Sequence, residues 1–123
     1  MSMFVTIRSG ALKGIERRRY PRIETDNRVG YICMDDNGNP LKEGVGKAIN
    51  ISQGGILIET PHSFEWQNIL FLGIDIENKT NRIKGRVVYC NATDSGIFRT
   101  GIEFLEVNER ILSFVIHLLK THL

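Results

Sequence analysis

The sequence predicts a mainly β domain, a six-stranded antiparallel barrel or sandwich that ends in a C-terminal α-helix. Two observations carry this prediction. First, six short apolar runs with strand-like alternation follow one another, and each is bounded by Gly, Asn, Asp or Pro. Second, the spacing of apolar residues changes to a helical period over residues 108–123.

Six segments are expected to be strands. They are residues 28–35, 45–51, 55–60, 69–77, 82–90 and 97–105. The turn sequence DNGNP follows the first segment and favours a hairpin there, the loop SQGG separates the second from the third, and NKTN at 78–81 is expected to turn the chain. Alternation places one set of apolar side chains on a common face in the first and fourth segments. These are Val29, Tyr31 and Cys33, and Leu70, Leu72, Ile74 and Ile76.

The last segment, NERILSFVIHLLKTHL, is expected to be an amphipathic helix with Asn108 as its N-cap and Glu109 in its first turn. Its apolar stripe consists of Ile111, Phe114, Val115 and Leu118. Leu112, Ile116 and Leu119 widen this stripe. The helix therefore either packs deeply or offers a surface to a partner, and packing is the preferred interpretation.

The length of 123 residues suits one domain, with 41% hydrophobic and 24% charged residues. Cys33 and Cys90 stand singly in apolar segments, which indicates buried, reduced thiols of a cytoplasmic protein. The N-terminus has no basic region followed by an apolar one, and no apolar run reaches the length of a membrane span. We expect a cytoplasmic protein without membrane insertion.

Positive charge is concentrated in ERRRYPR, residues 16–22. The segment Lys13 to Arg22 carries a net charge of +4, whereas the whole chain is only +2 and Arg8 supplies one further positive charge, so residues 23–123 sum to −3. A protein that binds nucleic acid over a whole face would spread its positive charge. Taken alone, the run is more simply a solvated basic tail.

The loop sequence NISQGG, residues 50–55, places Asn50 and Ser52 two residues apart at the end of a strand, so their side chains point the same way. An amide and a hydroxyl on one face can read a hydrogen-bonding edge. Gly54 and Gly55 allow a tight turn or the close approach of a ligand. An ordinary turn between strands explains the same residues.

Together, ERRRYPR and NISQGG resemble the two motifs of the PilZ family, bacterial domains that bind the second messenger cyclic di-GMP. The family pattern is RxxxR followed by (D/N)xSxxG. Arg18 and Arg22 fit the first motif, and Asn50, Ser52 and Gly55 fit the second. The resemblance covers residues 16–118, including GRVVYC, RTGIEF and the closing helix. It implies an N-terminal extension over residues 1–15 and a PilZ barrel over residues 16–123.

The resemblance implies that Arg18 and Arg22 clamp phosphates and bases, because a guanidinium pairs with phosphate oxygens in a planar fork and stacks on bases. Asn50 and Ser52 would read a guanine, and Gly55 would keep the loop open. Further candidate contacts are Arg17, Arg19, Gly54, Arg86 and Tyr89. For Tyr89, core packing is the slightly preferred interpretation.

The arginine segment has no strand pattern, so we expect it to be mobile without ligand and to fold across the barrel mouth when ligand binds. An unidentified downstream protein would then read the changed surface. Three consecutive arginines followed by Arg22 carry more positive charge than the two phosphodiesters of one cyclic dinucleotide require. This suggests two cyclic di-GMP molecules per chain. Family outputs include flagellar motility, pilus function, exopolysaccharide synthesis and virulence. No cofactor is expected, and the three histidines show no metal-ligand spacing.

Two other classes of protein are alternatives to this receptor. In a small nucleic-acid-binding barrel, ERRRYPR would be an electrostatic arm, but the strands lack interleaved aromatic residues and the body is acidic. An enzyme would need a nucleophile, a base or a metal cluster. Asp35 and Asp36 lie in a turn, and Ser52 has no histidine beside it in the sequence. We therefore expect a binding protein without catalytic residues.

Overall fold

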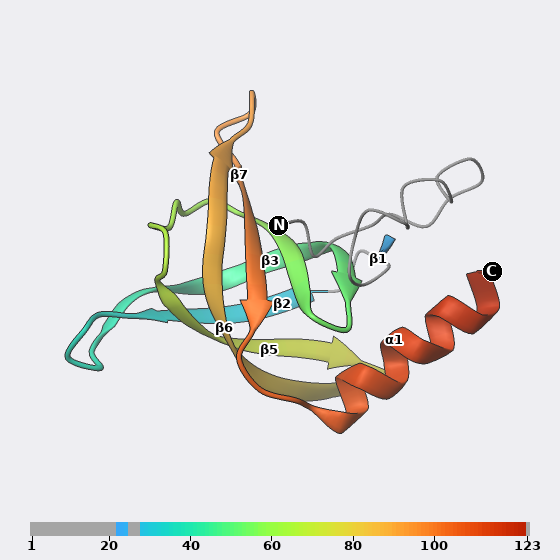
Figure 1. The fold of residues 1–123 in the computed structure, drawn as a ribbon. Helices are drawn as coiled ribbons and strands as arrows, with labels where there is room; N and C mark the ends of the chain where they lie inside the picture. Colours follow the sequence, from blue (N-terminus) through green and yellow to red (C-terminus); the bar gives the residue numbers. More distant parts are fainter. Residues whose placement is uncertain (1–21, 25–27, 123) are drawn as a thin grey trace.

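The computed structural model describes residues 22–24 and 28–122 and shows a closed antiparallel barrel followed by one helix (Figure 1). In chain order the elements are β1 (Arg22–Glu24), β2 (Arg28–Met34), β3 (Pro40–Ser52), β4 (Gly55–Thr60), β5 (Ile69–Ile76), β6 (Lys79–Ala92), β7 (Phe98–Phe104) and α1 (Glu109–His122). Among these described elements, six strands close the barrel in the order β3, β2, β5, β6, β7, β4 and back to β3. The predicted barrel and helix are confirmed.

The two long strands, β3 and β6, each belong to two parts of the barrel. β3 pairs with β2 over its first part and with β4 toward its end, and β6 passes in the same way from β5 to β7. Each strand bends where it changes partner. At these bends a Cβ on Gly46 would lie 2.5 Å from the carbonyl oxygen of Glu59, and one on Gly85 would lie 2.4 Å from Cγ2 of Ile102. Only glycine fits so close an approach.

The short strand β1 was not expected, because the arginine segment shows no alternation. Arg22, the last residue of ERRRYPR, begins this strand. β1 pairs antiparallel with the end of β3, along the edge that β4 leaves free. A three-residue strand is too short to show a period of two, so its pairing partner, not its own sequence pattern, defines it.

The β5–β6 turn also differs from the prediction. The chain turns at Glu77 and Asn78, whose φ angles are 51° and 66°, and β6 already begins at Lys79. The prediction that NKTN, residues 78–81, forms the turn is therefore wrong. The turn begins one residue earlier, at Glu77, and residues 79–81 belong to β6. Two-residue turns with positive φ at both positions match the right-handed twist of the flanking strands, which explains the tighter connection.

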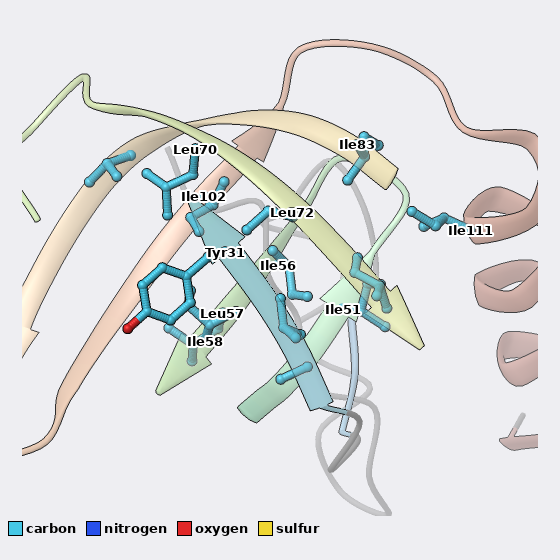
Figure 2. Close-up of a cluster of buried hydrophobic side chains, with 14 of the residues drawn as sticks. Tyr31, Ile51, Ile56, Leu57, Ile58, Leu70, Leu72, Ile83, Ile102 and Ile111 are labelled. Atoms are coloured by element: carbon cyan, nitrogen blue, oxygen red, sulfur yellow. The ribbon is translucent and has the colours of Figure 1, made fainter. Parts of the chain in front are cut away.

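Aliphatic side chains from every barrel strand fill the interior (Figure 2). The largest fully buried side chains are Ile51, Ile56, Ile58, Leu70, Leu72, Ile74, Ile102, Ile111, Val29 and Val87. The apolar faces predicted for residues 28–35 and 69–77 are buried as expected. Each such side chain contributes about 1.5–3 kcal/mol by leaving water.

Helix α1 closes one end of the core. Oδ1 of Asn108 accepts hydrogen bonds from the backbone N–H groups of Arg110 and Ile111, at 3.0 and 3.1 Å, which confirms the predicted N-cap. The amide of Asn108 also donates to the carbonyl of Arg82 at 2.8 Å and so ties the helix to β6. Ile111 and Val115 are buried, so the helix packs as preferred. This helix has 14 residues, which is too short to cross a membrane. The described part of the chain contains no other helix that is long and apolar enough to do so.

Aromatic residues lie near the other end of the core. The hydroxyl of Tyr31 lies 2.6 Å from Nδ1 of His62, and its ring meets that of Phe64 edge to face at 5.4 Å. Cys33, two residues along β2, is buried. Burial raises the pKa of its thiol; nearby Lys42 opposes this shift.

We expect Cys33 to make the folded state less stable in alkaline solution. Because burial raises its pKa in the folded chain, the unfolded chain releases this proton first as pH rises past the usual value of 9.0. The Cys33→Ala variant should therefore lose less free energy of unfolding between pH 8 and pH 10 than the unmodified protein, as measured by urea unfolding. Cys90→Ala, which retains Cys33, is the control. Equal pH dependence in the Cys33→Ala variant and the unmodified protein would contradict the prediction.

Candidate functional site

The pairing of β1 with β3 brings parts of both predicted motifs together. Arg22 lies opposite Ser52, and Glu24 lies opposite Asn50. Opposed residues of antiparallel strands have Cα atoms only about 4.5–5.5 Å apart. The backbone of Arg22 is thus adjacent to the second motif. The other arginine candidates, Arg17, Arg18 and Arg19, lie outside the described residues.

Ser52 makes its hydrogen bonds inside its own loop. Its hydroxyl oxygen accepts from the backbone N–H groups of Gly54 and Gly55, at 3.2 and 3.1 Å, and its O–H donates to the carbonyl of Gly55 at 3.3 Å. The carbonyl of Gly54 in turn accepts from the N–H of Phe104 on β7, at 2.9 Å. Ser52 therefore shapes the loop and, with Phe104, fixes it to the barrel. Its predicted contact with a ligand stays a prediction.

Asn50 is placed differently. Its side chain is only 3% exposed, yet Oδ1 has no hydrogen-bond partner among the described residues. A buried acceptor without a partner costs about 1–3 kcal/mol. Since an amide oxygen can only accept, this atom suits an N–H donor brought by a ligand.

Two rows of paired residues extend the site across the outer surface of the barrel. In the first row, Gly55 lies opposite Glu103, and Glu103 lies opposite Arg86. The second row consists of Asn50, Leu57, Gly101 and Tyr89. The residues between the rows, Ile56, Ile102 and Val87, point into the core. We call the outer surface over Asn50, Ser52, Gly55, Arg86 and Tyr89 the motif face.

Arg86 is paired with a carboxylate on this face. Its Nε donates to Oε1 of Glu103 at 2.9 Å, and a second guanidinium nitrogen contacts the same oxygen. The two side chains are 43% and 24% exposed, so the pair contributes little to stability. Glu103 was missed by sequence reasoning, because nothing in the sequence shows which residue faces Arg86 across the strands.

Tyr89 lies on the motif face, and the prediction that it packs in the core is wrong. The side chain is 37% exposed, and its ring lies over Gly101, where a Cβ would be 2.3 Å from Cε2 of the ring. A register shift between Val87 and Tyr89 leaves Val88 as an extra residue, and this bulge turns Tyr89 outward. The structure therefore keeps Tyr89 among the candidate contacts.

These features, a six-stranded barrel with the second motif at the end of one strand and Arg22 beside it, define a class of small binding domain. The model of the PilZ domain matches residues 16–120, and the chain belongs to the PilZ family. Among curated protein sequences, none matches the chain.

Solved structures share the fold. The chain is similar to MotI/DgrA, the inhibitor of motility of Bacillus subtilis, with a TM-score of 0.66 and 21% identity over 85% of this chain and 52% of that one. It is also similar to the PilZ domain of Escherichia coli YcgR with c-di-GMP, with a TM-score of 0.60 and 12% identity over 86% and 91% of the two chains.

A third similar structure is the c-di-GMP complex of MrkH from K. pneumonia, with a TM-score of 0.61 and 16% identity. It is matched over 85% of this chain and 52% of that one. The chain thus spans about half the length of MotI/DgrA and of MrkH. At these identities the likeness concerns the fold.

We expect the Ser52→Ala variant to be destabilised by about 1–3 kcal/mol, because the buried N–H group of Gly55 and the half-buried N–H group of Gly54 lose their acceptor. Urea unfolding measures this change. Ser63→Ala removes a hydroxyl from an exposed loop residue and serves as the control. An unchanged free energy of unfolding in the Ser52→Ala protein would show that the loop does not depend on this hydroxyl.

Proposed function

We propose that this PilZ domain is a receptor for cyclic di-GMP that signals to a downstream protein. The observation that carries the proposal is the pairing of β1 with β3, which sets Arg22 of the first motif beside Ser52 of the second. Membership of the PilZ family and the similarity to two proteins solved with c-di-GMP, YcgR and MrkH, support it.

In this proposal the arginines bind the phosphodiesters. Arg18 and Arg22 pair with phosphate oxygens and stack on bases, as a guanidinium does well and an ammonium does not. Arg86 adds a cation on the same face and would share its charge between Glu103 and a phosphate. Tyr89 offers a partly exposed ring in the same row as Asn50.

The second motif reads the base. Oδ1 of Asn50, buried and without a partner in the described part of the chain, accepts a hydrogen bond from a guanine N–H group. Ser52 holds Gly54 and Gly55 in the shape that lets a base approach, and its hydroxyl is the second polar group at the site. Adenine reverses the donor and acceptor pattern of guanine at these positions, so cyclic di-AMP fits poorly.

Binding then changes the surface that a partner reads. The arginine segment folds over the motif face, and a downstream protein in the cytoplasm recognises the new surface. The output belongs to motility, pilus function, exopolysaccharide synthesis or virulence. The domain acts as an adaptor without catalysis or cofactor, because its ligand is itself the signal.

We expect Arg22→Ala to weaken cyclic di-GMP binding by about ten- to a hundredfold, the loss of one charge-assisted hydrogen bond of about 1.5–3 kcal/mol. Isothermal titration calorimetry measures the affinity, and Arg110→Ala, which removes an exposed arginine on α1, is the matched control. A folded Arg22→Ala protein with unchanged affinity would exclude the arginine segment as the phosphate clamp.

The same titration tests the ligand class. Cyclic di-GMP should bind far more tightly than cyclic di-AMP, GMP or a short oligonucleotide. Equal affinity for the two cyclic dinucleotides would show that only phosphates are recognised. Affinity that rises with oligonucleotide length and falls steeply with salt would instead identify a nucleic-acid-binding barrel.

We further expect two cyclic di-GMP molecules per chain. Arg17, Arg18 and Arg19 together with Arg22 place four cations in six residues, and four phosphodiesters of an intercalated pair would balance them. The Arg17→Leu variant should bind one ligand and keep its fold. Saturation of the unmodified protein at one ligand per chain, with the active fraction measured separately, would refute this stoichiometry.

A further inference from the structure

A second surface of the barrel holds a hollow that the motif face does not include. It lies on the outer side of β2, β5 and the first half of β6 and has a volume of about 380 Å³. Its lining includes Gly30, Ile32, Phe71, Gly73 and Arg82. These residues form two neighbouring rows, since Gly30 lies opposite Gly73 and Ile32 lies opposite Phe71.

Of the two glycines at the base of the hollow, Gly30 is required neither by its backbone conformation nor by a close neighbour, whereas Gly73 lies close to Thr80. Neither Gly30 nor Gly73 has a positive φ angle. A Cβ on Gly30 would meet nothing closer than the carbonyl oxygen of Gly73 at 4.0 Å, which is ordinary contact. A Cβ on Gly73 would lie 3.0 Å from Cγ2 of Thr80, so the open position is Gly30. Glycine inside a strand costs about 0.5–1 kcal/mol relative to alanine, and it often marks a place where another molecule comes close.

Exposed apolar side chains form the wall of the hollow. Ile32 is 38% exposed and Phe71 is 45% exposed, although each stands in the middle of a barrel strand. A cation, Nζ of Lys84, lies 5.9 Å from the centre of the Phe71 ring. An apolar side chain seated over the two glycines would cover Ile32 and Phe71.

Charges of both signs surround the glycine pair, and three cations lie together on one side of it. Arg82 ends the row of the glycines, and Arg28 and Lys47 lie opposite one another in the next row. Among the described residues, none of these three cations forms an ion pair with a carboxylate. Four acids lie nearby, and each is engaged elsewhere or lies on another side. Glu106 lines the hollow and accepts from the N–H of Lys84, and Glu43 lies opposite Ile32. Asp75 accepts from Thr80, and Glu59, opposite Lys47, is paired with Arg99. The side of the hollow around Arg28, Lys47 and Arg82 therefore favours negative charge in whatever binds there.

We infer that this hollow is a docking surface for an acidic segment of a partner protein. The segment places one apolar side chain over Gly30 and Gly73 and sets carboxylates against Arg82 and Arg28. This inference goes beyond the proposed receptor function and does not depend on it, because no residue of the motif face takes part. β6 contributes residues to both surfaces, with Arg82 at the hollow and Arg86 and Tyr89 on the motif face (Figure 1).

The test is a titration followed by amide chemical shifts in NMR, without any dinucleotide. The probe is a synthetic peptide with one phenylalanine between two pairs of glutamates. We expect saturable shifts at Gly30, Ile32 and Gly73. A peptide with serine in place of phenylalanine, and one with lysines in place of the glutamates, should each bind at least about tenfold more weakly.

Two variants locate the contact. Gly30→Val fills the hollow with a residue that favours strands and should weaken binding of the probe at least about tenfold, whereas Asn91→Val, on an exposed part of β6, should not. Arg82→Glu should weaken binding severalfold, whereas Lys120→Glu, with the same charge change on α1, should not.

Three outcomes would overturn the inference. The first is chemical-shift changes confined to another surface, and the second is binding of the lysine peptide as tightly as the glutamate peptide. The third is tight binding of the protein to vesicles of anionic lipid without binding to any of the three peptides. The last outcome would mark a membrane-facing surface instead. Because the measurement uses no cyclic di-GMP, its failure would leave the receptor proposal standing, and failure of that proposal would leave this one standing.

Discussion

The close approach of strands at Gly46 and Gly85 is the constraint on which the barrel depends. At both places a Cβ would lie about 2.5 Å or less from an atom of the next strand. The bends there let β3 and β6 each pair with two sets of neighbours. The pairing of β2 with β3 ends at Lys47, so the edge of β3 from Asn50 onward is open to β1. Arg22 lies beside the second motif because of that opening.

The two polar residues of the second motif are held in opposite states. The hydroxyl of Ser52 forms hydrogen bonds with the backbone of its own loop. Oδ1 of Asn50, in contrast, is buried without a hydrogen-bond partner in the described residues. One residue therefore stabilises the fold, and the other carries an unsatisfied acceptor that a ligand could pair. Such a division lets the loop be ordered before binding, so that less conformational entropy is lost in the complex.

Local features were predictable from the sequence, and pairings between distant strands were not. The alternation of β2 and β5 and the N-cap of Asn108 depend on neighbours within a few residues, and the structure confirms them. The register of β1 on β3 and the Arg86–Glu103 pair depend on residues far apart in the chain. The outward turn of Tyr89 depends on one extra residue in a strand, which no alternation pattern reveals.

The pairing of β4 with β7 also bears on how the site forms. This contact joins residues 40 positions apart, as in the hydrogen bond from Arg99 to Glu59, and it completes the circuit of strands. Non-local pairings of this kind slow folding, because the chain loses loop entropy before it gains contacts. The bond from Phe104 to Gly54 belongs to the same closure. The loop of the second motif is therefore anchored at Gly54 only when the last strand is in place, although Ser52 shapes the loop from within.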